Sequence, residues 1–142
     1  LETFQAGLSW ATILHKRENF RRAYEGFLPE RVAAFDAAKI DALIQDADII
    51  RNRRKIEASI TNSRVFLDIV REYGSFDAYI WGFTEGKSIR ESWELRTTSP
   101  LSDRITKDLK RRGMKFVGST SIYSTLQAIG VLAAHAEDCD WR

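Results

Sequence analysis

A carboxylate and an indole lie close together at the start of the chain, in the stretch "LETFQAGLSW". The face of Trp10 can attract a flat or cationic group, and Glu2 can balance positive charge while accepting hydrogen bonds. Each residue also has a simpler interpretation. Trp10 would more often be a core aromatic, and Glu2 an exposed acid, because glutamate is rarely buried.

Basic residues form two clusters, "RNRRK" at 51–55 and "KDLKRRGMK" at 107–115, although the net charge is only +2. The first cluster opens an expected helix after a short turn, in "LIQDADIIRNRRKI". A helix N-terminus has unpaired N–H groups and a partial positive charge, so such a turn could bind a phosphate. Charge clusters are also common on solvated helix faces, and that alternative stays open.

His135 and Cys139 are spaced four residues apart, which places them on one face of a helical turn. Zinc binds both ligand types, but a lone pair at this spacing is more often chance than a site.

Helices account for nearly the whole chain, and almost no strands are expected. Ser9, Pro29 and Asp36 mark helix starts, while Gly74 followed by Ser75 indicates a stop and a new cap. We expect an all-α bundle of about seven helices, with a loop over 84–100. The expected helices cover residues 10–24, 29–36, 37–46, 52–73, 75–83, 99 or 102 to 112, and 119–135.

The 142 residues are enough for one domain with one core, so 1–142 is expected to be a single domain. No apolar run approaches the roughly 20 residues that span a membrane. One cysteine, Cys139, cannot form an internal disulfide, which favours a reducing compartment, the cytoplasm.

The motifs "LETFQAGLSW", "KREN", "LIQDADIIRNRRKI", "SPLSD" and "KDLKRRGMKFVGST", followed by His135 and Cys139, resemble in order the bacterial 3-methyladenine DNA glycosylase I family. The resemblance implies a helix-hairpin-helix DNA glycosylase fold and excision of 3-methyladenine from double-stranded alkylated DNA, leaving an abasic site. It also implies that Glu2 is the catalytic, base-recognising carboxylate, that Trp10 stacks on the flipped base, and that Gly7 and Leu8 approach the vacated stack.

The resemblance also places the stretch "KRRGMKFVGST" near the pocket for the flipped base. Further DNA contacts are expected from this stretch and from the basic cluster at 51–55. The expected residues are Arg51, Arg53, Arg54, Lys55, Lys115, Ser119 and Thr120. Phe116 and Val117 are expected to pack in the core. Asp48 replaces a common hairpin glycine, so a strained turn is expected there.

In the family, His135 and Cys139 resemble half of a structural zinc site whose other ligands lie in a segment ahead of Glu2. We therefore expect a chain that lacks this segment, with zinc binding possible, and a monomer. The main alternative function is a non-catalytic helix-hairpin-helix module that binds damaged DNA. A helical protein-interaction domain is a third, less favoured hypothesis.

Overall fold

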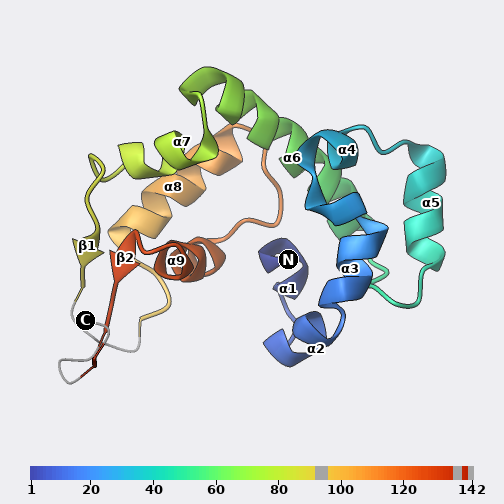
Figure 1. The fold of residues 1–142 in the computed structure, drawn as a ribbon, viewed down its shortest axis with the longest axis horizontal. Coiled ribbons are helices and arrows are strands. Elements are labelled where there is room, and N and C mark those ends of the chain that lie inside the picture. Colours follow the sequence, from blue (N-terminus) through green and yellow to red (C-terminus); the bar gives the residue numbers. More distant parts are fainter. Residues whose placement is uncertain (92–95, 136–138, 141–142) are drawn as a thin grey trace. The chain divides into compact units, whose positions relative to one another are not determined.

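The computed structural model describes residues 1–91, 96–135, 139 and 140 (Figure 1). Those residues are mainly helical, which confirms the all-α prediction. They divide into two compact units, 1–68 with 112–116, and 69–111 with 117–142. The expectation of a single domain stays a prediction. Within the described part of the chain, no helix is long and apolar enough to cross a membrane.

The first unit contains a series of short helices and the beginning of one long helix (Figure 1). The elements are α1 (Glu2–Gln5), α2 (Trp10–His15), α3 (Arg17–Ala23), the 3-10 turn η1 (Glu25–Phe27), α4 (Pro29–Ala33), α5 (Ala37–Gln45) and α6 (Arg53–Tyr73). Helix α6 begins in the first unit and ends in the second.

The helix starts follow local signals in the sequence. Ser9 Oγ accepts the N–H of Thr12 at 3.2 Å, and Asp36 Oδ1 accepts the N–H of Lys39 at 2.8 Å. Pro29 occupies the first turn of α4, where its missing N–H costs nothing. These starts confirm the predicted caps.

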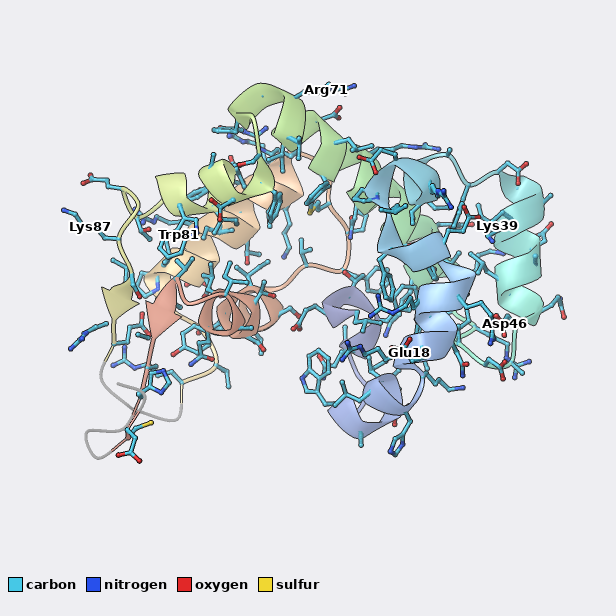
Figure 2. All side chains as sticks on the ribbon, in the orientation of Figure 1. Glu18, Lys39, Asp46, Arg71, Trp81 and Lys87 are labelled. Carbon is cyan, nitrogen blue, oxygen red and sulfur yellow. The ribbon has the colours of Figure 1, made fainter. Side chains whose placement is uncertain are left out.

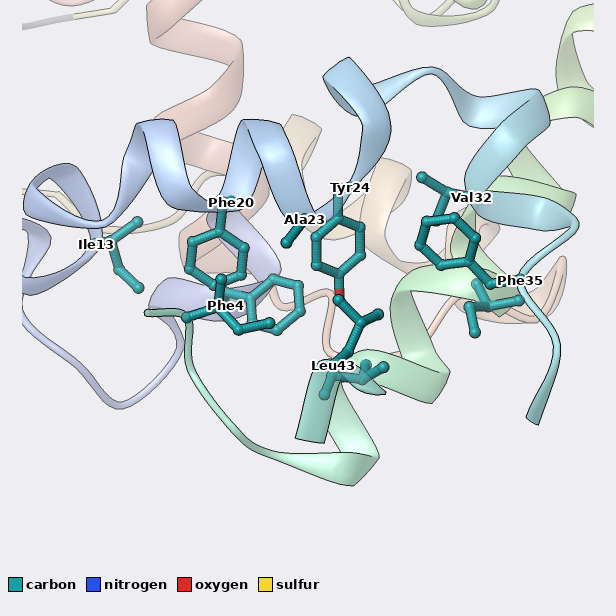
Figure 3. Packing of buried hydrophobic residues seen from close by; sticks show 11 residues of the cluster. Phe4, Ile13, Phe20, Ala23, Tyr24, Val32, Phe35 and Leu43 are labelled. Atoms are coloured by element: carbon teal, nitrogen blue, oxygen red, sulfur yellow. The ribbon is translucent and has the colours of Figure 1, made fainter. Parts of the chain in front are cut away.

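An aromatic cluster forms the centre of the first unit (Figure 3). The ring centroids of Phe4 and Phe20 lie 4.7 Å apart, and that of Tyr24 lies 5.6 Å from Phe4. The Tyr24 hydroxyl meets Ser59 Oγ at 3.3 Å, and burial raises the pKa of Tyr24 to about 12. The tyrosine thus buries its ring and still keeps a polar partner, as buried tyrosines usually do.

The second unit contains α7 (Phe76–Gly82), β1 (Ile89–Arg90), α8 (Pro100–Arg111), α9 (Ser119–Ala128) and β2 (Leu132–Ala133). The two short strands pair in parallel, with Ile89 opposite Leu132. Ser99 Oγ accepts the N–H of Ser102, so Ser99 is the cap of α8. Trp81 lies on α7 (Figure 2), whereas Trp93 is outside the described residues.

The bounds or type of three predicted elements were wrong in part: the helices over 10–24 and 119–135, and the loop over 84–100. The helix expected over 10–24 is divided at Lys16 into α2 and α3. The helix expected over 119–135 ends at Ala128, because Gly130 takes a φ of +77° and the chain continues into β2. Helix α1 was not predicted, and the expected loop contains β1.

Candidate functional site

The segment from Glu2 to Trp10, here called the recognition segment, carries the first candidate site residues. Glu2 lies in the first turn of α1 and is half-buried. Burial raises the pKa of its carboxyl, an effect that the charge of the Leu1 amino group partly opposes. A carboxylate in such a place is held at an energetic cost, which is more typical of a site than of a surface acid.

Trp10 begins α2 with its side chain 38% exposed. Among the described residues it has no aromatic neighbour in ring contact. The indole is therefore not a core side chain, and part of it is exposed. This excludes the simpler interpretation that the sequence left open.

A tight turn connects α1 and α2 and presents an apolar side chain. Gly7 takes a φ of +79°, in the left-handed region that favours glycine. The N–H of Leu8 donates to the Gln5 carbonyl at 2.7 Å, and Gln5 Nε2 donates back to the Leu8 carbonyl at 2.8 Å. Leu8 remains 36% exposed at the top of this closed turn. No role for Gln5 was predicted from the sequence, and its side-chain amide closes the turn.

Lys55 differs from the other residues of its basic cluster, because its side chain is only 6% exposed. Its ammonium group donates to the carbonyls of Phe4 at 2.9 Å and Ala6 at 2.5 Å. Burial lowers the pKa of Lys55. The predicted phosphate contact requires a cation that reaches solvent, whereas here Lys55 points into the protein.

The connection between α5 and α6 is held by side chains from α3 and from the break before it. Lys16 Nζ donates to the carbonyls of Ala47 and Asp48, each at 3.1 Å. Arg22 Nη2 pairs with Asp48 Oδ2 at 2.9 Å. Asp46, at the end of α5 (Figure 2), accepts the N–H of Asp48 through Oδ1 at 2.9 Å. Asp46 and Asp48 are thus turn residues, as expected.

The predicted strain at Asp48 is wrong, because Asp48 is not among the described residues with positive φ. An ordinary backbone conformation accommodates any side chain, and the carboxylate gains a pair with Arg22.

The N-terminus of α6 presents three arginines to solvent. Arg53 pairs with Asp41 at 2.7 Å and with Glu57 at 3.6 Å, whereas Arg51 and Arg54 have no ion pair within the part of the chain that the structure describes. Asn52 Oδ1 accepts only the N–H of Lys55 there, at 3.2 Å. The first N–H groups of this 21-residue helix can therefore attract an anion.

A shallow pocket of about 420 Å³ lies beside this helix, lined by Arg54, Glu57, Ala58, Thr61, Lys115 and Phe116. The amide of Asn62 holds its far wall: Nδ2 donates to the Lys115 carbonyl at 2.9 Å, and Oδ1 accepts the Lys115 N–H at 2.7 Å. The core packing expected for Phe116 is wrong, since its ring is 41% exposed and its φ is +51°. Val117 is half-buried.

Ser119 and Thr120, the remaining predicted contacts, begin α9 in the second unit. Ser119 Oγ bonds to the fully buried Ser102 Oγ at 2.7 Å, so this hydroxyl helps to join α8 and α9. Thr120 is exposed.

His135 and Cys139 lie beyond α9 but remain close, with Nδ1 and Sγ 3.5 Å apart. Two ligands of a tetrahedral zinc ion, at about 2.0 Å for nitrogen and about 2.3 Å for sulfur, would be separated by roughly 3.5 Å. The pair therefore fits one edge of a zinc tetrahedron. The described residues contain no group of three or more histidine, cysteine and acidic side chains that could hold a metal.

The all-α fold matches solved structures of 3-methyladenine DNA glycosylase I, so the class of protein is an all-α DNA glycosylase. It is similar to a point variant of 3-methyladenine DNA glycosylase I in complex with 3-methyladenine, with a TM-score of 0.91 and 37% identity over 98% of this chain and 77% of that one. The fold is also similar to a structure of 3-methyladenine DNA glycosylase I from Staphylococcus aureus, solved to explain its recognition of 3-methyladenine. The TM-score is 0.90 at 37% identity, over 98% of this chain and 76% of the other.

The whole chain, residues 1–142, matches the methyladenine glycosylase family, and it belongs to that family. It is 41% identical to DNA-3-methyladenine glycosylase 1 of Escherichia coli, over 98% of this chain and 76% of the relative. The DNA-3-methyladenine glycosylase of Haemophilus influenzae is 38% identical over 98% of this chain and 77% of its own length.

Proposed function

We propose that this chain excises 3-methyladenine from double-stranded alkylated DNA and leaves an abasic site. The observation that carries the proposal is the recognition segment, where the carboxyl of Glu2 is half-buried and the Trp10 indole is exposed. The family match across the entire chain supports the same reaction.

Both side chains suit the chemistry of this base. Adenine methylated at N3 is cationic, so the face of Trp10 attracts it more strongly than ordinary stacking would. Glu2 can accept hydrogen bonds from the edge of the base and balance its charge. Because the susceptible bond is inaccessible within a duplex, the nucleotide must first be flipped out. Leu8, exposed on its closed turn, is suited to fill the vacated stack.

Cleavage needs little chemical assistance, because the leaving base already carries positive charge. Holding the flipped base and placing negative charge near the developing oxocarbenium sugar supply much of the acceleration. Glu2 is the residue assigned to this role. Asp46 and Asp48 are not assigned as general bases, since one accepts a turn N–H and the other pairs with Arg22.

Binding of the DNA backbone is assigned to a helix-hairpin-helix element. This element consists of α5, the connection from Asp46 to Asn52, and the start of α6. The exposed arginines and the N–H groups of Arg53 and Arg54 at the helix N-terminus bind phosphate without reading sequence. Arg54 and Lys115 extend this basic surface at the pocket beside α6.

Zinc is a further proposal, with His135 and Cys139 as two of its ligands. The 3.5 Å separation of their ligand atoms supports it. The metal would have a structural role, holding the chain beyond β2. Cobalt(II) titration tests this, because a thiolate ligand gives a charge-transfer band that Cys139→Ser should abolish. We also expect a monomer, and the lone cysteine favours the cytoplasm.

The experiment that tests the function is release of free 3-methyladenine from alkylated DNA. Glu2→Gln and Trp10→Ala should lose base release while keeping most of the affinity for abasic DNA. Glu18→Gln is the matched control, because Glu18 pairs with Arg21 on α3 and is exposed. Abasic-DNA binding by the unsubstituted chain without any base release would instead indicate a binding module that does not cleave.

A further inference from the structure

Lys55 is a buried cation whose charge no carboxylate balances, as far as the described residues extend. Its hydrogen bonds go to two backbone carbonyls, those of Phe4 and Ala6. Removing an ammonium group from water is costly, and an apolar side chain of similar length could fill the same space. The lysine therefore contributes its hydrogen bonds to these carbonyls, which an apolar side chain could not make.

The two carbonyls lie at the end of α1, and no backbone N–H of the described residues bonds to either of them. Helix α1 has only four residues, and its N–H groups at Phe4 and Gln5 both bond to the Leu1 carbonyl. The last carbonyls of any helix are left unpaired and carry partial negative charge. Lys55 binds these groups and so completes the end of the helix.

A helix this short does not hold its shape in water, so outside contacts must set its position. The Phe4 ring anchors α1 in the aromatic core, at 4.7 Å from Phe20. Leu1 also packs against this core, but apolar contacts are not directional and do not fix the carbonyls at the end of α1. Lys55 supplies a directional attachment, a hydrogen bond to the end of α1. It lies in the first turn of α6, 51 residues from Phe4 along the chain.

We propose that Lys55 is a positioning residue for base excision: its ammonium group fixes the end of α1 and thereby sets where Glu2 and the Gly7–Leu8 turn lie. The inference rests on the proposed function. It also links the two functional parts of the first unit, because the residue that orients the recognition segment follows directly after the phosphate-binding arginines on α6.

The test compares Lys55→Met with the unsubstituted chain in single-turnover release of 3-methyladenine. Methionine keeps the length and packing of the side chain but removes the donors. We expect base release to slow by about 10- to 100-fold, since small displacements in a site have effects of this size. The slope of log affinity for abasic DNA against log salt should not change, because no phosphate contact is lost. Lys55→Arg, which retains the charge and donors, should recover part of the rate.

Lys87→Met is the matched control, because Lys87 is an exposed lysine of the second unit (Figure 2), whereas α1 belongs to the first unit. It should release base at the unsubstituted rate. Hydrogen exchange gives a readout independent of activity. The Leu8 amide, bonded to the Gln5 carbonyl, should exchange faster in Lys55→Met and at the unsubstituted rate in Lys87→Met.

A folded Lys55→Met variant with the unsubstituted rate overturns the inference. So does a variant that loses DNA affinity and salt dependence in proportion to rate, because that result makes Lys55 a phosphate contact. If Lys55→Met does not fold, Lys55→Gln replaces it. Its side chain is shorter and neutral, so base release should still slow, and a folded Lys55→Gln variant with the unsubstituted rate also overturns the inference. If the unsubstituted chain releases no base, the proposed function fails, and faster Leu8 exchange in the variant still tests the attachment.

Discussion

Replacing Gly7 with alanine should destabilise the protein through its backbone alone. Gly7 has a φ of +79°, and a Cβ built there meets no heavy atom within 4 Å. No clash therefore adds to the cost of placing a residue with a Cβ in the left-handed region, about 1–2 kcal/mol. We expect the free energy of unfolding of Gly7→Ala to fall by about that amount, measured by urea denaturation followed by circular dichroism.

Gly82→Ala is the matched control, with the opposite expected sign. Gly82 ends α7, and an added Cβ also meets nothing within 4 Å, but its φ lies outside the left-handed region. Alanine in a helix loses less conformational entropy on folding than glycine, so Gly82→Ala should stabilise by up to about 0.5–1 kcal/mol. The two variants differ in backbone conformation and not in crowding.

The backbone strain in Gly7→Ala can also be relieved if the turn changes its conformation. If residue 7 leaves the left-handed region, the reciprocal bonds between Gln5 and Leu8 must break, and Leu8 moves. The loss of stability is then smaller, and affinity for abasic DNA falls instead. Unsubstituted stability together with unsubstituted DNA affinity in Gly7→Ala would refute this reasoning.

Three further predictions concern charge and strain. Arg54→Ala should reduce the slope of log affinity against log salt by about 0.9, as for one lost phosphate contact, in a binding titration. Burial raises the pKa of Glu2, so base release should decline as pH falls through that raised pKa, and Glu2→Gln, which removes the half-buried charge, should stabilise the fold at neutral pH. Phe116→Gly, which relieves a φ of +51° at an exposed ring, should unfold at the same or higher urea concentration.

Local features of the fold could be predicted from the sequence. Ser9 and Asp36 cap helices within three residues of their own position, and Gly74 ends α6 with a φ of +83°. Such signals involve neighbouring residues only, so they can be read along the chain. The family resemblance, resting on several motifs in order, was confirmed over the whole chain.

Features that depend on distant contacts could not be predicted. The partners of Lys55 lie 51 and 49 residues away, and nothing in "RNRRK" distinguishes the one inward-pointing cation from its neighbours. The division at Lys16 likewise accompanies bonds to Ala47 and Asp48, more than 30 residues further along. Periodicity extended the last helix past Ala128, where an apolar run continues into β2.

The inward position of Lys55 also bears on how the enzyme would search a genome. Each phosphate contact changes affinity about threefold between 50 and 200 mM salt, and it strengthens binding to every sequence equally. Because Lys55 points inward, it adds no phosphate contact. The affinity for undamaged DNA is therefore lower, and the residence time on each undamaged site is shorter. The charge that would have slowed the search instead keeps the recognition segment ready for the rare lesion.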